Sequence, residues 1–282
     1  MINKTIDLWV NQAYEYSKID SFRPSLVTYV LAGEKSRSAV LICPGGGYSF
    51  TSDREAEQVA MQFNAAGFHA FIVYYSCAPR KHPQPLLDVS RAMCIIRENA
   101  EEWMVNRDEI AVCGFSAGGH LAASLGVHFN KPYLFENTGI KKDLNKPNAL
   151  ILNYPVISSS EFAHRDSFIN LLGADAESNL LYDMSLEHHV NEETPPTFIW
   201  HTFEDKTVPV ENSVLFAQAL CRKRIPFELH IYPEGSHGLS LATEETCTEG
   251  KEVNPHVASW LNLCIEWLKT CAYKKNKNIG KL

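Results

Sequence analysis

The chain has 282 residues, 45% of them hydrophobic, which is enough to bury a large core and favours one large α/β domain over two small ones. A formal net charge of −7 and a pI near 5.9 argue against a surface that follows nucleic-acid phosphates. The basic cluster Lys274-Lys275-Asn276-Lys277 is more typical of a solvated chain end than of a binding arm.

The cysteines and the amino terminus bear on the cellular compartment. Eight cysteines are scattered without a Cys-x-x-Cys pair, and those within apolar runs, which we expect to be reduced core residues, are Cys43, Cys94, Cys113 and Cys264. Residues 1–7 lack the apolar core of a signal peptide, and no stretch has the apolar length of a membrane span. We therefore expect a soluble, cytoplasmic protein with neither nucleic acid nor membrane as partner, whose oligomeric state the sequence does not set.

Strand patterns and helix patterns alternate along most of the chain. In chain order we expect strands at 22–31 and 38–43, a helix at 53–66, a strand at 69–75, a helix at 86–103, a strand at 109–113, a helix after Ser116, a loop at 131–147, strands at 148–154 and 197–201, a helix at 210–222, a strand at 227–232 and a helix at 255–271. Crossovers of helical length between apolar strands favour a doubly wound, mostly parallel sheet with helices on both faces.

The alternation breaks between Pro155 and Pro196. This segment has serine-rich turns, a short helix pattern at 168–172, a second at 178–184, and no strand pattern. An insertion at this point would lie over the carboxyl ends of the strands as a small cap. We therefore predict one domain over 1–282 with a cap-like insertion at about 155–196.

The most informative stretch is Gly114-Phe115-Ser116-Ala117-Gly118, between an apolar strand pattern and an Ala/Leu-rich helix pattern. Strand, sharp turn and helix are the context of a nucleophile elbow, which exposes a serine hydroxyl at the carboxyl end of a sheet. Side chains at Gly114 and Gly118 would collide with neighbouring backbone as the chain doubles back. The pentapeptide alone is weak evidence, but both flanks agree with it.

A serine nucleophile needs a base that takes its proton and an acid that orients the base. Among 11 histidines, His237 stands out because it lies in a glycine-flanked loop after the last strand pattern. The acid candidate is Asp205, which follows the strand pattern ending near His201, although its neighbour Glu204 stays open as an alternative. No metal-ligand spacing such as His-Glu-x-x-His is present, and we expect neither a metal nor a cofactor.

Three consecutive glycines follow a buried strand pattern in Pro44-Gly45-Gly46-Gly47-Tyr48. A phosphate-binding loop is excluded because no Gly-Lys-Ser/Thr follows. We expect the backbone N–H groups of Gly46, Gly47 and Ala117 to form an oxyanion hole. For the pocket lining we expect the following side chains, although core packing explains the aromatic ones equally well: Tyr48, Tyr75, Arg80 and Tyr154.

Five stretches together carry a family resemblance: 45–48, 82–88, 114–122, 201–209 and 235–238. On them the chain resembles the α/β-hydrolase superfamily from about Val40 to Leu268, and within it bacterial carbohydrate esterases of the acetyl xylan esterase and acetylesterase type. The resemblance implies that Ser116 is the nucleophile, Asp205 the orienting acid and His237 the base.

Two departures from relatives refine this expectation. Pro44 stands where hormone-sensitive-lipase relatives carry a histidine, which favours the esterase branch. Many relatives that act on plant polymers are exported, and a chain without a signal favours short acetylated oligosaccharides or other small acetyl esters as substrates.

The sequence therefore predicts a serine esterase that removes acetyl or other short acyl groups, with an acetylated carbohydrate as its small-molecule partner. One alternative is an aminopeptidase similar to the prolyl oligopeptidase group, but we expect no propeller domain, and an isolated Glu-Glu pair to hold a substrate amine is not evident outside Glu101-Glu102 and Glu192-Glu193. A non-catalytic binding protein on a hydrolase scaffold is the other alternative. It is disfavoured because all three catalytic candidates are present.

Overall fold

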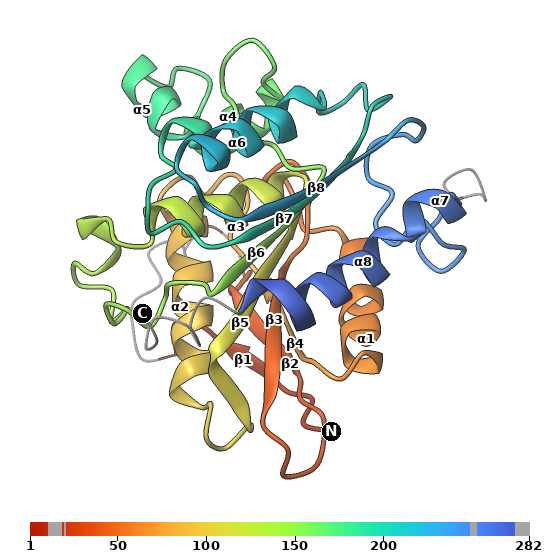
Figure 1. Ribbon diagram of the computed structural model, residues 1–282. Helices are drawn as coiled ribbons and strands as arrows, with labels where there is room; N and C mark the ends of the chain where they lie inside the picture. The colour runs from red at the N-terminus through yellow and green to blue at the C-terminus, as the bar shows by residue number, and fades with distance from the viewer. Residues whose placement is uncertain (11–18, 20, 249–252, 274–282) are drawn as a thin grey trace.

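The computed structural model of the protein describes residues 1–10, 19, 21–248 and 253–273 (Figure 1). The basic cluster 274–277 lies outside the described residues. In the described part, one eight-stranded sheet has the order β1-β2-β4-β3-β5-β6-β7-β8. The strands are β1 (Thr5–Asp7), β2 (Ser25–Tyr29), β3 (Arg37–Cys43), β4 (His69–Tyr74), β5 (Val105–Phe115), β6 (Ala149–Asn153), β7 (Thr197–Thr202) and β8 (Phe227–Tyr232).

The strand directions match the expected sheet. Strand β2 pairs antiparallel with both β1 and β4, and every pairing from β4 through β3, β5, β6 and β7 to β8 is parallel. Parallel strands end at the same edge of a sheet, so the loops that follow β3, β5, β7 and β8 gather there. These loops hold the expected nucleophile, acid and base, Ser116, Asp205 and His237, and the glycines Gly46 and Gly47.

Both faces of the sheet are buried, because successive side chains of a strand point to opposite faces. Leu41 and Val112 belong to one buried hydrophobic cluster, whereas Ile42 and Cys113 belong to the other. The first cluster is covered by helices α2 (Gln84–Glu98), α3 (Ala117–His128) and α6 (Glu211–Arg222). The second is covered by α1 (Glu57–Ala65), α7 (Pro255–Ala258) and α8 (Trp260–Trp267).

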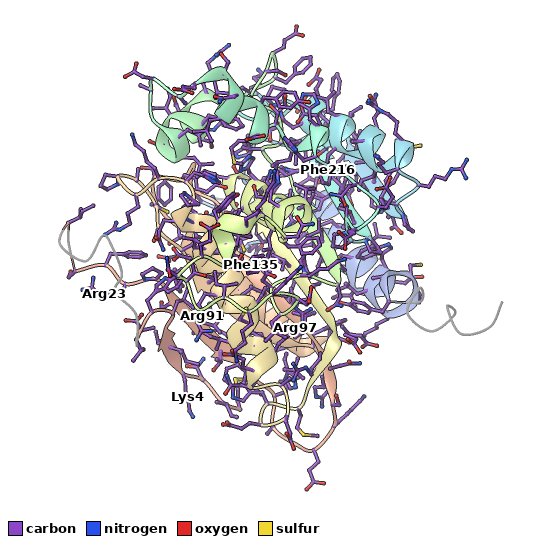
Figure 2. The ribbon with its side chains drawn as sticks, turned by 90° about the vertical axis from the view of Figure 1, so that its left-hand side faces the viewer. Lys4, Arg23, Arg91, Arg97, Phe135 and Phe216 are labelled. Carbon is purple, nitrogen blue, oxygen red and sulfur yellow. The ribbon has the colours of Figure 1, made fainter. Side chains whose placement is uncertain are left out.

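The figures make these layers visible. Figure 1 shows α1 and α8 on one side of the sheet and α2 and α3 on the other. Phe216 of α6 is fully buried, whereas Lys4, in the amino-terminal segment, is exposed (Figure 2). The prediction of a doubly wound sheet with helices on both faces is confirmed.

Several element boundaries differ from the expected ones. The short strand β1 was not predicted, because three residues give too little pattern. The expected helix 53–66 is a 3₁₀ turn, η2 (Asp53–Glu55), followed by α1. The expected helix 255–271 is divided into α7, α8 and a terminal π-helical turn, η5 (Leu268–Ala272). The expected loop 131–147 contains one 3₁₀ turn, η3 (Pro132–Leu134).

Residues 155–196, called the cap below, connect β6 to β7 and contain no strand. Their helices are α4 (Arg165–Leu172), α5 (Ser178–Asp183) and the 3₁₀ turn η4 (Leu186–His188). In Figure 1, α4 and α5 lie beside α6 at the top of the view. Phe168, Leu171 and Leu186 pack into the first hydrophobic cluster of the sheet. The cap therefore shares its core with the rest of the domain.

All eight cysteines have free thiols, and those in the apolar runs are buried as expected: Cys43, Cys94, Cys113 and Cys264. Within the described residues, no helix combines the length and apolar character needed to cross a lipid bilayer.

Candidate active site

The sharp turn between β5 and α3 has Ser116 at its corner. Its backbone lies at φ 52° and ψ −118°, a conformation that costs free energy and is retained where surrounding structure enforces it. Its N–H donates to the carbonyl of Asn153 at 3.0 Å, which ties the turn to β6. A Cβ on Gly114 would collide with the carbonyl of Gly118, and one on Gly118 would collide with the carbonyl of Cys43. Glycine at both positions therefore permits the backbone approach that the sequence predicts.

Three side chains from separate loops form a hydrogen-bonded chain. The Ser116 hydroxyl lies 2.8 Å from Nε2 of His237, and Nδ1 of His237 lies 2.6 Å from Oδ2 of Asp205. Because a carboxylate only accepts, Nδ1 carries the proton and leaves Nε2 as the acceptor for the serine hydroxyl. Ser116 and Asp205 are only 6% and 5% exposed. The structure thus brings together the three residues expected from the sequence.

Asp205 is held as an anion by its surroundings. Its Oδ1 accepts the N–H groups of Thr207 and Val208, both at 2.9 Å, and its Oδ2 lies 3.3 Å from Nε2 of His201. Burial raises the pKa of Asp205, but hydrogen bonds from His201, His237 and Val208 outweigh burial and hold this pKa well below its usual range. The side chain is therefore charged at every pH where a histidine base works.

The neighbouring acid, Glu204, points elsewhere. Its carboxylate accepts the N–H of Gly235 at 3.4 Å and is exposed. Of the two acids that the sequence left open, the geometry places Asp205, and not Glu204, against the imidazole of His237.

Residues 44–48, called the glycine loop below, follow β3 and lie against the elbow. A Cβ on Gly45 would be 3.1 Å from the Cβ of Ser116. Gly46 and Gly47 have φ of +124° and +62°, which favour glycine, and both border the same cavity as Ser116. Within the described chain, the N–H groups of Gly46, Gly47 and Ala117 donate to no protein acceptor. They remain available to an oxygen atom of a ligand, and their role as an oxyanion hole stays a prediction.

A cavity of about 580 Å³ opens above Ser116 and His237. It is bordered by residues from the glycine loop and the segment after it, from the elbow, from the cap and from the loops after β7 and β8: Gly46, Gly47, Ser49, Phe50, Ser52, Arg54, Glu55, Ser116, His164, Asp166, Ile169, Asn170, Thr207, His237 and Gly238. A second cavity of about 580 Å³ adjoins it at Thr207 and His237 and includes the exposed ring of Phe203. Across the described residues, no group of three or more His, Cys, Asp and Glu side chains is arranged to hold a metal ion.

The structure corrects the expected pocket lining. None of the four side chains proposed for it borders the cavity, and all four are buried: Tyr48, Tyr75, Arg80 and Tyr154. The Tyr75 hydroxyl donates to the carbonyl of Pro44 at 2.6 Å, and the Tyr48 hydroxyl lies 2.8 Å from Nδ1 of His120. Both rings are core side chains on the side of the glycine loop away from the cavity, and each hydroxyl has a hydrogen-bond partner, as buried tyrosines usually do. The guanidinium of Arg80 lies 4.9 Å from the ring centroid of Phe22.

Several residues at the cavity were not singled out from the sequence. His164, Asp166 and Asn170 belong to the cap, whose polar composition gave no signal for which of its side chains face the site. Asn170 donates to the carbonyl of Gly47 at 2.9 Å. Glu55 is a buried acid just after the glycine loop, and an acid inside an otherwise amphipathic pattern was its only sequence signal.

Comparisons with known proteins identify the family of the chain. Residues 28–220 match the model of the family designated BD-FAE. The chain is 40% identical over 244 residues to the protein named endo-1,4-beta-xylanase B of Butyrivibrio fibrisolvens, and 30% identical over 249 residues to the acetylxylan esterase of Xylanibacter ruminicola. These alignments cover 85% and 86% of the chain but 38% and 49% of the two relatives, so the chain spans less than half the length of either.

A solved structure matches over nearly the whole length of both chains. The crystal structure of an acetyl ester-xyloside bifunctional hydrolase from Caldicellulosiruptor lactoaceticus has a TM-score of 0.88 and 39% identity, with 96% of this chain and 97% of that chain covered. The resemblance to α/β-hydrolases and acetyl xylan esterases seen in the sequence is thereby confirmed. The chain belongs to the BD-FAE family and has the α/β-hydrolase fold.

Proposed function

We propose that the protein is a serine carboxylic ester hydrolase that removes acetyl or other short acyl groups from acetylated sugars or xylo-oligosaccharides. The observation that carries the proposal is the chain of hydrogen bonds from Ser116 through His237 to Asp205 beside a cavity. Relatives named as an acetylxylan esterase and as an acetyl ester-xyloside hydrolase support the substrate class.

In the first half of the reaction, Oγ of Ser116 attacks the carbonyl carbon of the ester while Nε2 of His237 takes the hydroxyl proton. The carboxylate of Asp205 stabilises the imidazolium that forms and keeps its ring oriented. The carbonyl oxygen becomes an oxyanion, and the free N–H groups of Gly46, Gly47 and Ala117 are the donors proposed to receive it.

Collapse of this intermediate breaks the bond between the carbonyl carbon and the alcohol oxygen. His237 gives its proton to that oxygen, so the alcohol leaves and the acyl group stays on Ser116. Water then enters, His237 takes one of its protons, and the resulting hydroxide attacks the acyl carbon. The carboxylic acid departs as the proton on His237 returns to Oγ of Ser116, which restores the starting state.

The cavity supports a compact, hydroxylated substrate. Its volume of about 580 Å³ is in the range of small-molecule sites. The cap contributes His164, Asp166 and Asn170, which are able to exchange hydrogen bonds with sugar hydroxyls, and the apolar side chains of Phe50 and Ile169 are 62% and 47% exposed. This mixture of polar and apolar surface fits an acetylated sugar better than a long acyl chain, which would need a broad apolar trough.

The aminopeptidase alternative gains no support from the placement of the acidic pairs. Neither Glu101-Glu102 nor Glu192-Glu193 borders the cavity at Ser116. Glu192 and Glu193 instead form ion pairs with Lys223 and Lys146.

The proposal is tested by hydrolysis rates on p-nitrophenyl acetate, butyrate and octanoate, on peracetylated xylose and acetylated xylo-oligosaccharides, and on an aminoacyl p-nitroanilide. We expect rapid turnover of acetate and of acetylated sugars, a steep decline by octanoate, and no turnover by the Ser116→Ala variant. A preference for the anilide over all esters would assign a peptidase. No turnover of any substrate would support the non-catalytic alternative.

A further inference from the structure

The catalytic steps above make no use of Glu55, although this acid borders the cavity that contains Ser116 and His237. Its side chain belongs to η2 and the residue is only 4% exposed. Burial of a carboxyl group is costly unless donors and positive charge compensate for the lost water. The fold must therefore supply hydrogen-bond donors to the carboxyl group of Glu55.

The two carboxyl oxygens of Glu55 accept hydrogen bonds from different parts of the site. Oε2 accepts the N–H of Gly45 at 2.7 Å, which fixes the peptide unit between Pro44 and Gly45, directly before the unit that carries the N–H of Gly46. Oε1 accepts the hydroxyl of Tyr154 at 2.6 Å. Both bonds are accepted by Glu55, as a carboxylate requires.

Tyr154 connects this carboxylate to the base. Its ring centroid is 5.1 Å from that of His237, with the two planes at 73° in an edge-to-face arrangement. Its hydroxyl oxygen accepts the N–H of Ser240 at 2.9 Å, so the hydroxyl proton is directed to Glu55. Glu55 thus contacts the glycine loop directly and reaches the imidazole of His237 through a rigid, fully buried side chain.

We propose that Glu55 is a positioning residue for acyl transfer. Its carboxylate holds the glycine loop in place and holds the ring of Tyr154 against His237, and its negative charge favours the protonated imidazole of His237. This inference rests on the proposed esterase function. It assigns two effects to one side chain, one geometric and one electrostatic, and the two are separable by substitution.

The charged groups around His237 set the expected sign of the electrostatic effect. Asp205 from the loop after β7 and Glu55 from η2 favour the protonated ring as carboxylates, whereas His164 from the cap opposes protonation when it is itself charged. Burial raises the pKa of Glu55, and its hydrogen bonds from Tyr154 and Gly45 act against that rise. Arg54, next to Glu55, donates to the carbonyl of Gly238 beside His237 and also opposes it. Asp166, which lies near His164 in the cap, adds negative charge at the other side of the cavity.

The test is Glu55→Gln, which keeps the shape of the side chain and removes its charge. We expect kcat/KM for p-nitrophenyl acetate to fall about tenfold, mainly through kcat, because the glycine loop is held less firmly in the variant. This loss is smaller than the loss of about 10²–10³ that follows removal of an oxyanion donor itself. We also expect the acidic limb of the pH profile of kcat/KM to move to lower pH, since an anion that favours protonation of the base is gone. A purely structural role would lower the rate at every pH and leave the limb in place.

Glu57→Gln is the matched control, because it removes the same charge from an exposed acid two residues further along. We expect Glu57→Gln to leave both the rate and the acidic limb unchanged. Glu55→Asp keeps the charge but is too short to reach Gly45 and Tyr154 together. For Glu55→Asp we expect a reduced kcat with the acidic limb at its wild-type position.

All rates refer to the concentration of active sites, measured by titration, so that partial misfolding does not imitate the effect. Wild-type kcat in Glu55→Asp would overturn the geometric effect. An unmoved limb in Glu55→Gln, a moved limb in Glu55→Asp, or a moved limb in Glu57→Gln would overturn the electrostatic effect. Wild-type protein that hydrolyses no ester would contradict the proposed function itself, and that outcome is distinct from all of these.

Discussion

The side-chain amide of Asn170, in helix α4 of the cap, donates to the carbonyl of Gly47 across 2.9 Å. This bond joins the inserted segment to the loop whose N–H groups are proposed to stabilise the oxyanion. The peptide unit before Gly47 is held through the carbonyl of Gly46, which accepts the N–H groups of Ser49 and Phe50, whereas the carbonyl of the peptide unit after Gly47 is held by Asn170. The cap therefore has a role in loop geometry as well as in covering the cavity.

This relationship predicts the effect of Asn170→Ala. Loss of one hydrogen bond of ordinary strength, about 1 kcal/mol, lowers kcat for p-nitrophenyl acetate roughly fivefold if the bond orients the glycine loop in the transition state. Asn179→Ala, in the exposed part of α5, is the control and retains the wild-type kcat. Equal rates for both variants would show that the cap does not support the loop.

The elbow predicts a large loss of stability for Gly118→Ala. The added Cβ meets the backbone carbonyls of Cys43 and Pro44, which are fixed in β3 and the glycine loop and are unable to move aside cheaply. We expect the free energy of unfolding, measured in urea, to fall by about 3 kcal/mol.

Gly126→Ala is the comparison for this variant. The added Cβ meets only the side chain of Leu150, and alanine is the better helix former. We expect a markedly smaller loss for Gly126→Ala than for Gly118→Ala. Equal losses would mean that backbone contact at the elbow is not what requires glycine.

The acid partner of the base gives a third prediction. Asp205→Asn keeps the shape of the side chain but no longer stabilises the imidazolium of His237, so kcat falls by about 10⁴. Glu204→Gln, the matched change at the neighbouring acid, leaves kcat within about twofold because Glu204 contacts Gly235 and not His237. The measurement is kcat on p-nitrophenyl acetate for both variants. A large loss in Glu204→Gln alone would reassign the acid.

The buried histidine after the elbow predicts acid sensitivity of the fold. Burial lowers the pKa of His120 to about 4, and both of its ring nitrogens are hydrogen-bonded. In the unfolded chain His120 is protonated near pH 6.5, whereas the folded protein resists this protonation. The contribution of His120 to the free energy of unfolding is therefore present above pH 6.5 and is lost as the pH falls toward 4. The expected loss from this one group between pH 7 and 4.5 is about 2–3 kcal/mol.

Urea unfolding of the wild type and of His120→Gln at both pH values measures this contribution. We expect the drop in unfolding free energy between pH 7 and 4.5 to be smaller in His120→Gln than in the wild type. His82 and His128, with pKa values lowered by burial to about 4 and about 3, act in the same direction in both proteins. Asp88, whose pKa burial raises to about 6, acts in the opposite direction in both. Identical drops would contradict the assignment to His120.

The sheet and the three central residues were predictable because their signals are local. Apolar runs such as 38–43 mark buried parallel strands, and Ser116 and Asp205 each follow such a run. His237 follows the partly exposed edge strand β8, and because this strand is also parallel the topology brings all three residues to one edge. The division between η2 and α1, or between α7 and α8, depends on packing and left no periodic trace.

The pocket lining was not predictable for a physical reason. An aromatic residue beside a glycine-rich loop is equally consistent with a wall of the cavity and with support behind it, and Tyr48, Tyr75 and Tyr154 provide support. Asn170 reaches Gly47 from 123 positions further along the chain, and only the folded cap brings the two together. Glu55 is equally dependent on tertiary structure, because its partner Tyr154 follows a different strand.

The most direct test of the proposed chemistry is covalent labelling with diethyl p-nitrophenyl phosphate, followed by peptide mass spectrometry. We expect one diethylphosphoryl group per molecule, carried by Ser116, with loss of ester hydrolysis in proportion to labelling and no label on the Ser116→Ala variant. A label on another residue accompanied by loss of activity, or undiminished hydrolysis by Ser116→Ala, would contradict the account.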